Sequence, residues 1–388
     1  MNIIMKYISQ FLIFFTAFFL ISCEKEIDFK GKEEAPRMVL NAIVNPDSCI
    51  KVFLSESQFF LSTNLYDDYK TINDAKVYVW RNGEMLEELT FDDKTSYVGS
   101  HTGIYKGSFI PSIGDKIKIT AEHPNFPSVE SEEVVIPTPI QIISIDTVDF
   151  KCYATKYSGL YTGDDVGDYY PNYEITEDSV YRVVTSSKVR IIFNDPEKIK
   201  NYYRVFVGIN DKYDGENDSY NRVFCYSTDL VFSNSMMGLE NTCWYNEFDD
   251  LLFDGETYTL TIGFYQERSY NRSDEYYYRD RIPNEREITV RLESLCESNY
   301  KYYSSLSLSG YVGDGVFSEP VQIYSNIKGG MGIVGAYSVS RSTIQLPQWE
   351  EMEYFEYYER RDRDYDEYWN QQERHSLGLH YSPWAFEY

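Results

Sequence analysis

Glycines near the end of the chain have the spacing of a dinucleotide-binding loop. The run Gly330-Met331-Gly332-Ile333-Val334-Gly335 fits G-x-G-x-x-G, in which glycines let the backbone approach a pyrophosphate. That chemistry requires a helix directly after the glycines, because the pyrophosphate lies at a helix N-terminus. Residues 336–346 instead have a strand-like composition and are followed by Pro347. We therefore expect no nucleotide cofactor and interpret these glycines, with Gly329, as sites of positive φ or close backbone packing.

Acidic loops are a second group of residues that could do chemistry, in this case calcium binding. The candidates span residues 163–168 and 210–218. An EF-hand loop needs oxygen ligands at its first, third and fifth positions, then a glycine and a distal glutamate. With Gly215 as that glycine, Lys212 takes a ligand position and Asn221 replaces the glutamate. The EF-hand pattern fails, which leaves solvated loops or an irregular calcium site, and we predict no metal centre.

Catalytic groups are scarce. The chain has only four histidines, none of them in an H-E-x-x-H zinc frame: His101, His123, His375 and His380. It also has no G-x-S-x-G nucleophile elbow. Carboxylates are so abundant that their pairing carries no information. These features predict a protein that is not an enzyme.

Five of the six cysteines have no pattern that indicates chemistry: Cys49, Cys152, Cys225, Cys243 and Cys296. No C-x-x-C pair is present, so neither a zinc nor a redox motif is indicated. A short loop separates Cys225 from Cys243, and a disulfide between them is compatible with an oxidising compartment. Buried free thiols explain the same spacing, and both alternatives stay open.

The sixth cysteine, Cys23, has the clearest chemistry. The apolar run from Phe11 to Ile21 ends at Ser22-Cys23, and charged residues follow. The run is shorter than the roughly 20 apolar residues that span a membrane, so it predicts a signal peptide over residues 1–22. A small residue before a cysteine is typical of a lipobox, and we predict that Cys23 is acylated and becomes the first mature residue. The alternative is an ordinary secreted protein with a chance cysteine near its cleavage site.

Composition describes the body behind this anchor. Aromatic residues make up 17% of the chain, with 38 tyrosines, and the formal net charge is −26. So acidic a protein is an unsuitable partner for nucleic acid. The same charge favours a body held off anionic lipid by a tether, which we place at residues 23–36. The length is ample for two domains.

Two-residue alternation of apolar residues begins at Met38 and predicts strands. The set from Met38 to Val44 is the first, and further sets follow up to the Pro137-Thr138-Pro139 break. Asn82-Gly83, between two of these strands, predicts a type I′ hairpin because both residues tolerate positive φ. Short strands without a helical stretch between them predict a β-sandwich domain over residues 37–139.

Further alternating sets predict a second β-rich domain over residues 140–347, and hence an all-β fold with two tandem β-sandwiches. Two polar, tyrosine-rich insertions, residues 157–177 and 270–286, are expected to be long surface loops. Ser294 and Glu297 have the spacing of a capping box. This pattern predicts one short helix over residues 295–306.

The composition changes again after Pro347. Residues 348–388 are acidic and aromatic, and pairs such as Glu356 with Arg360 have a spacing that supports a helix. This tail is interpreted either as a solvated acidic helix or loose segment, or as an arm that docks on a partner through its aromatic stripe.

The late glycines belong to a longer stretch that resembles a known family. Residues 317–338, from Phe317-Ser318-Glu319-Pro320 to Ala336-Tyr337-Ser338, closely resemble the C-terminal signature of Bacteroidota outer-membrane lipoproteins grouped as domain of unknown function 4249. Other segments look like the same family: Cys23–Phe29, Asn201–Val205, Phe253–Gly255 and Tyr300–Leu308. The resemblance runs from Cys23 to about Pro347 and leaves out the tail.

The resemblance implies an N-terminal sandwich similar to the prealbumin-like carboxypeptidase regulatory domain and an association with TonB-dependent outer-membrane transporters. Glu24, Glu26 and Asp28 look like the signal that directs lipoproteins of these bacteria to the cell surface. No biochemical activity comes with the family. We therefore expect a non-enzymatic outer-membrane surface lipoprotein that serves such a transporter as an accessory or substrate-capturing partner. Two alternatives stay open, an independent glycan- or peptide-binding module and a structural envelope protein without a ligand.

Overall fold

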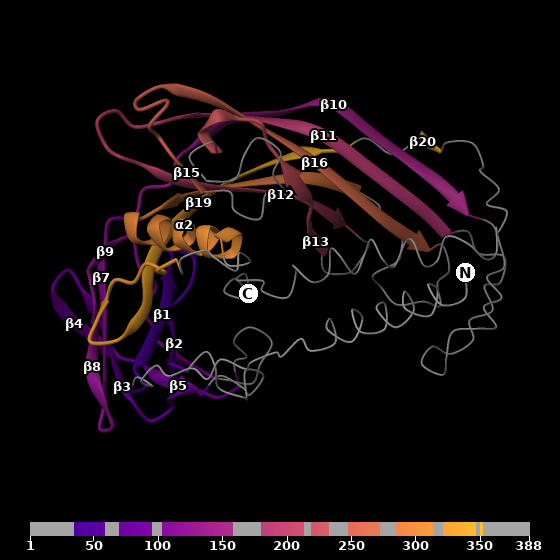
Figure 1. The fold of residues 1–388 in the computed structure, drawn as a ribbon. Coiled ribbons are helices and arrows are strands. Elements are labelled where there is room, and N and C mark those ends of the chain that lie inside the picture. Colours follow the sequence, from indigo (N-terminus) through magenta and orange to yellow (C-terminus); the bar gives the residue numbers. More distant parts are fainter. Residues whose placement is uncertain are drawn as a thin grey trace, which may run out of the picture.

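The computed structural model describes residues 35–58, 70–94, 103–157, 180–212, 219–232, 247–271, 285–312, 321–346 and 350–351. Within these ranges the chain forms three β-sheets, one α-helix and one short 3-10 helix, η1 (Leu230–Phe232) (Figure 1). The prediction of an all-β fold with one helix is confirmed. The predicted signal peptide, most of the predicted tether and all of the tail except residues 350–351 lie outside the described residues.

Two sheets enclose a first hydrophobic core. One part of a nine-stranded sheet contributes four strands: β1 (Met38–Val44), β2 (Lys51–Glu56), β5 (Thr90–Asp92) and β6 (Ile104–Lys106). A six-stranded sheet covers them: β3 (Lys76–Arg81), β4 (Glu84–Glu88), β7 (Lys116–His123), β8 (Phe126–Ser131), β9 (Val134–Val135) and β18 (Ile327–Lys328). In β1 every second residue is buried, as the alternation in the sequence predicts, because one face of the strand lies on the core.

A second core lies between the rest of the nine-stranded sheet and a five-stranded sheet. The nine-stranded sheet contributes β12 (Tyr202–Lys212), β13 (Ser219–Arg222), β15 (Glu247–Asp249), β17 (Glu285–Leu295) and β19 (Met331–Gln345). The five-stranded sheet consists of β10 (Ile142–Tyr157), β11 (Val180–Asn194), β14 (Phe224–Tyr226), β16 (Thr257–Asn271) and β20 (Glu350–Glu351). The three long strands β10, β11 and β16 pair along most of their length. Strand structure reaches only the edges of the stretches expected to be loops, at residues 157, 270–271 and 285–286, and the rest of both stretches lies outside the described residues.

β19 belongs to both sandwiches and makes the nine-stranded sheet continuous. Its first six residues pair with β1 in parallel, and the rest pair with β17 antiparallel. Residues 327–336 fall in the range expected to form the second domain, yet β18 pairs with β8 and the start of β19 with β1. Val334 and Ala336 are buried in the first core, and Ile344 lies opposite Ile288 of the second core. Because alternate residues of a strand share a face, both cores lie on one face of this sheet.

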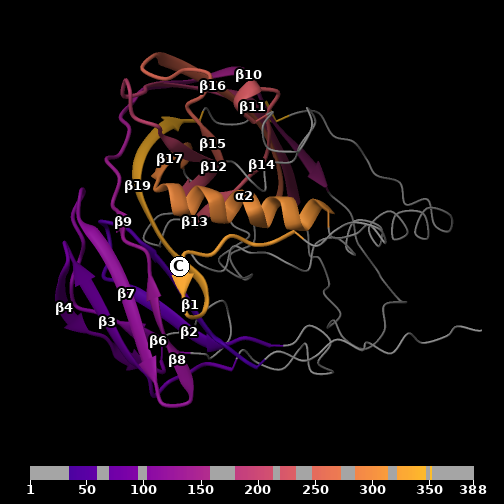
Figure 2. The same cartoon turned by 60° about the vertical axis from the view of Figure 1, so that its left-hand side comes forward.

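The single α-helix, α2 (Glu297–Val312), packs on the opposite face, against β19, β12 and β15. In both views it lies between the two sandwiches (Figure 1, Figure 2). The helix begins two residues later than predicted because Ser294 and Leu295 end β17. Ser294 does not cap the helix, since its Oγ accepts the backbone N–H of Ile140 at 3.1 Å. Within the described ranges, no helix has the length and apolar composition needed to cross a membrane.

Two predictions about turns and glycines are confirmed. Asn82 and Gly83 have φ of 52° and 86°, as a type I′ turn between β3 and β4 requires. At the glycine run the chain continues as a strand, with no helix after it. Gly332 has φ of 110°, and a Cβ there would lie 2.2 Å from the carbonyl oxygen of Leu40. Only glycine therefore lets β19 approach β1 at this point.

Candidate functional site

Two crossovers join the sheets of the second sandwich at one end. Residues 195–201 lead from β11 to β12, and residues 250–256 lead from β15 to β16. β15 pairs with the start of β12, and the start of β16 pairs with the end of β11, so the two crossovers run side by side. They are also joined directly, because the N–H of Asp195 donates to the carbonyl of Glu256 and that of Asp250 to the carbonyl of Asn201.

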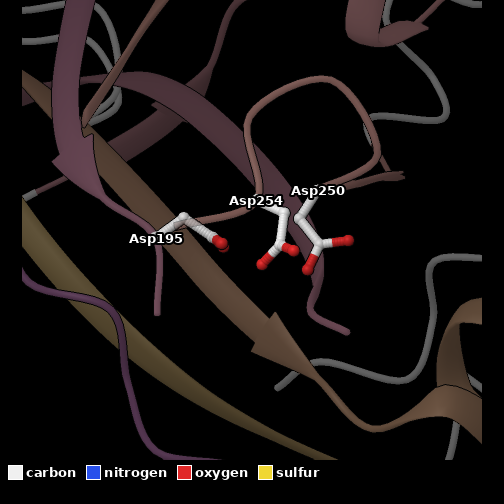
Figure 3. Close-up of side chains that lie close together, drawn as sticks. All are labelled: Asp195, Asp250 and Asp254. Carbon is white, nitrogen blue, oxygen red and sulfur yellow. The ribbon is translucent and has the colours of Figure 1, made fainter. Parts of the chain in front are cut away.

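Three aspartates meet between these crossovers and form what we call the aspartate cluster: Asp195, Asp250 and Asp254. One carboxylate oxygen from each residue lies within 4.8 Å of the other two, and Asp195 faces Asp250 and Asp254 from the opposite loop (Figure 3). Asp195 and Asp250 are buried, whereas Asp254 is exposed. Like charges so close together repel each other more strongly where water is excluded.

Each carboxylate accepts a backbone N–H from the other crossover. Gly255 donates to Asp195 Oδ2 at 2.9 Å. In the other direction, Asn201 donates to Asp250 Oδ2 at 2.5 Å and Lys198 donates to Asp254 Oδ1 at 3.1 Å. The cluster therefore braces the two loops against each other, and this role accounts for the position of every carboxylate.

Burial and repulsion change the proton affinity of the cluster. Burial raises the pKa of Asp195, and the charge of Asp254 adds to this rise, although hydrogen bonds from Tyr203 and Gly255 oppose it. Burial also raises the pKa of Asp250, with a further contribution from the charge of Asp195. The cluster thus binds protons more readily than free aspartates do.

Aromatic rings form the floor beneath the cluster. The Tyr203 hydroxyl donates to Asp195, and burial raises the pKa of that tyrosine. Its ring centroid lies 5.7 Å from that of Phe193 and 5.4 Å from that of Phe248. Phe253 stacks on Tyr258 at 4.4 Å. These rings keep water from one side of the carboxylates, which is why burial dominates their pKa shifts.

Carboxylate oxygens in such a group suit a hard cation such as Ca²⁺. The sequence predicted no ligand at these positions, because Asp195 lies far from Asp250 and Asp254 along the chain. The local signals were turn sequences only, Asn194-Asp195-Pro196 and Phe253-Asp254-Gly255. Neither acidic loop considered for calcium supplies the cluster, and residues 163–168 and 213–218 of those loops lie outside the described residues.

A second polar group lies under α2. Arg204 of β12 is 0% exposed and forms an ion pair with Glu293 of β17 at 2.7 Å. Its guanidinium lies 4.1 Å from the ring centroid of Tyr303 on α2. One turn along the helix, Ser307 donates to Glu247 Oε1 at 2.8 Å, and burial raises the pKa of Glu247. The helix is thus held on the sheet by these polar contacts and by the stacking of Tyr300 on Tyr202. An apolar periodicity in the sequence does not indicate polar contacts of this kind.

A third polar group lies between the two sheets of the second sandwich, at the far end from the crossovers. Arg286 was expected on a surface loop, but it lies in β17 and is 5% exposed. Its Nε donates to Asp211 at 3.1 Å, and its terminal nitrogens donate to Thr185 at 3.0 Å and Gln266 at 2.9 Å. Arg286 therefore ties β17 to β12 in its own sheet and to β11 and β16 in the facing sheet. Its partners are other side chains of the fold, so the group is structural.

The remaining residues singled out in the sequence are scattered. Cys23 lies outside the described residues, as does Cys243, so both the lipidation and the disulfide stay predictions. Cys225 is buried on β14. His123 lies at the end of β7, with Nε2 3.1 Å from Asp74 Oδ1, and His101, His375 and His380 lie outside the described residues. None of these residues joins the aspartate cluster.

Comparison with known proteins places the chain in a family without assigning an activity. No curated protein matches it at a significant level. The family model of a domain of unknown function, DUF4249, matches residues 24–343. The match includes both sandwiches, the shared strand β19 up to residue 343 and the aspartate cluster. Because this match covers most of the sequence, the chain belongs to the DUF4249 family.

Proposed function

We propose that the protein is a non-enzymatic outer-membrane lipoprotein, anchored through acyl chains on Cys23 and facing the cell surface. In this role it serves a TonB-dependent transporter as an accessory or substrate-capturing partner. The observation that carries the proposal is the apolar run that ends at Ser22-Cys23 and is followed by acidic residues. Several acyl chains anchor a protein firmly, because each buried methylene contributes about 0.8 kcal/mol.

The arrangement of the body is compatible with such an anchor. β1 begins at Met38, so the tether after Cys23 is short. Fully extended, about 15 residues span roughly 50 Å, which keeps the body close to the membrane and to a neighbouring membrane protein. A net charge of −26 supports a body that stands off anionic lipid and does not lie on it.

The chemistry of the described residues supports a non-enzymatic role. The best-placed charged groups of the second sandwich serve the fold: Arg204 pairs with Glu293, and Arg286 with Asp211. The aspartates of the cluster brace two loops. Catalytic groups need a substrate within hydrogen-bond reach, and the buried ion pairs leave little access for one.

Cell fractionation tests the anchor. Cys23→Ser should move the protein from the membrane fraction to the soluble fraction, because the acylated sulfur is lost. Cys49→Ser is the matched control, since Cys49 forms no disulfide, and this variant should stay in the membrane fraction. If the Cys23→Ser protein remains membrane-bound, the anchor proposal is wrong.

Crosslinking in cells tests the partner. After crosslinking, the outer membrane is gently solubilised, and the lipidated chain should be recovered in a complex with a TonB-dependent transporter. Repeated recovery as a lone monomer would argue strongly against an accessory role. Affinity of the isolated protein for a glycan or peptide, with no transporter present, would favour an independent binding module instead.

A further inference from the structure

The strand β19 lies between the segment that enters β1 and the segment that follows the second sandwich, so it can transmit tension from one to the other. In the part of the chain that the structure describes, β1 is the first strand and β19 is the last long strand. The two strands pair in parallel over six residues, from Val39 opposite Met331 to Val44 opposite Ala336. Beyond Ala336, β19 continues without interruption into the second sandwich and pairs with β17 up to Gln345.

Side chains fix β19 in place beside β1. Val334 and Ala336 are fully buried in the first core. The side chain of Asn326 accepts a hydrogen bond from the N–H of Val334 at 2.9 Å and donates one to the carbonyl of Val334 at 2.8 Å. Asn41 of β1 accepts the N–H of Ile333 at 3.2 Å. The start of β19 is therefore held by core packing and by buried hydrogen bonds as well as by the strand ladder.

Parallel pairing determines how this contact responds to tension. The tether enters at the N-terminal end of β1, and the tail leaves at the C-terminal end of β19. In a parallel pair these two ends point in opposite directions along the strand axis. Tension between the tether and the tail therefore slides the strands past each other and loads all the hydrogen bonds of the pair together. An antiparallel pair pulled from adjacent ends would open one bond at a time.

We propose that the β1–β19 pair is a force-bearing clamp that carries tension between the lipid anchor and a partner bound to the second sandwich or the tail. This inference rests on the proposed function, because the anchor and the partner supply the two points of attachment. The glycine run has a defined part in the clamp. At Gly330 and Gly332 a Cβ would lie 2.4 and 2.2 Å from the carbonyl oxygens of Met38 and Leu40, so only glycine allows the pair to close.

Single-molecule force measurements on residues 24–388 test the clamp, with handles at the two chain ends. The wild-type chain should resist until the β1–β19 pair slips. The first sandwich should then unfold in one step of roughly 350 Å, since about 100 residues extend by up to 3.5 Å each. Gly332→Ala should shorten the lifetime of the clamp at constant force by about tenfold or more, because the new Cβ meets β1.

Gly114→Ala is the matched control. Gly114 also has positive φ, at 85°, but a Cβ there would meet no atom within 4 Å. Both variants therefore place a Cβ at a residue with positive φ, and only Gly332→Ala also brings that Cβ against β1. The lifetime of the clamp in Gly114→Ala should stay within about twofold of wild type. Equal lifetimes in the two variants would overturn the proposal.

A change of pulling direction tests the clamp without any destabilising substitution. A handle at Asp93, an exposed residue of the first sandwich, moves the load away from the axis of β1. Pulling between Asp93 and the tail should unfold the first sandwich at a clearly lower force than pulling between the two ends. Equal forces in both directions would show that no directional clamp exists. These measurements use unlipidated protein, so their failure is distinct from failure of the anchor at Cys23.

Discussion

The two sandwiches have different interiors. The first core is almost entirely apolar, and among the described residues its buried charge is Asp115, which pairs with Arg81 at 2.9 Å at the edge of the sandwich. The second sandwich and the sheet face under α2 bury several charged side chains that are at most 5% exposed: Arg204, Asp211, Glu247, Asp250, Arg286 and Glu293. The first is stabilised by removal of apolar surface from water, whereas the second also depends on pairing of charges that water cannot reach.

This difference determines which substitutions destabilise each sandwich. An apolar core loses stability in proportion to the volume removed from it. A buried ion pair behaves differently, because removal of one partner leaves the other charge without compensation in a medium of low dielectric constant. The second sandwich should therefore be more sensitive to single changes of charge than the first is to single changes of volume.

The largest effect is expected from Arg286→Leu. This change removes the ion pair between Arg286 and Asp211, whose carboxylate is 0% exposed, and it removes hydrogen bonds to Thr185 and Gln266. The free energy of unfolding should fall by about 4 kcal/mol. Urea unfolding of residues 24–388, followed by circular dichroism, measures this loss.

Arg190→Leu is the control for that prediction. Arg190 donates two hydrogen bonds to Asp146 on the neighbouring strand, at 2.8 and 2.6 Å, so the geometry of this pair is at least as good. Both side chains are about half exposed, at 49% and 48%. Water compensates each charge when its partner is lost, and the loss of stability should be small. Similar losses in the two variants would show that burial does not determine how strongly the second sandwich depends on an ion pair.

A smaller loss is expected from Leu40→Ala in the first core. Leu40 is fully buried, and the cavity left by its side chain should lower the free energy of unfolding by about 3 kcal/mol. No charge is uncovered, so the loss should be the same at pH 5 and pH 8. Leu86→Ala is the matched control, because Leu86 lies in the same sandwich but is 40% exposed. A strongly pH-dependent loss in Leu40→Ala would contradict the description of this core as apolar.

The same difference decides what could be read from the sequence. The alternation from Met38 to Val44 and the turn at Asn82-Gly83 are local patterns, and both predictions are confirmed. Arg286 was expected on a loop because a charged residue in a polar stretch is usually exposed. Its burial depends on Asp211 and Thr185, which reach it only through strand pairing, and no local pattern reveals such a contact.

The shared strand and the aspartate cluster were missed for a related reason. The glycine run predicted close backbone packing, but nothing in it identified β1, about 290 residues earlier, as the strand that is approached. The three aspartates come from two crossovers whose neighbourhood is set by the pairing of β12 with β15. In each case the residues are informative only after the register between distant strands is known.

The smallest effect is expected from Asp254→Asn. Whether this change raises or lowers the stability at neutral pH distinguishes a cluster that only braces two loops from a cluster that binds a cation. The pKa values of Asp195 and Asp250 are raised in the folded state, so they favour the folded state below the ordinary aspartate pKa, near 3.8. This contribution is lost as the pH rises through the raised values. Asp254→Asn removes one like charge and keeps an oxygen that can accept the N–H of Lys198. The variant should therefore gain stability at neutral pH and match the wild type near pH 3.

The gain should stay below about 1 kcal/mol, because Asp254 is exposed and its charge is screened by water and salt. Thermal unfolding at a series of pH values, repeated at high salt, measures it. Freshly prepared protein is needed, since the substitution places an asparagine directly before Gly255, a sequence prone to deamidation. Asp93→Asn, at an exposed aspartate of the first sandwich, should show no comparable gain. A loss of stability at neutral pH in Asp254→Asn would mean that a cation bound from solution compensates the three negative charges. The cluster would then act as a cation site and not only as a brace between two loops.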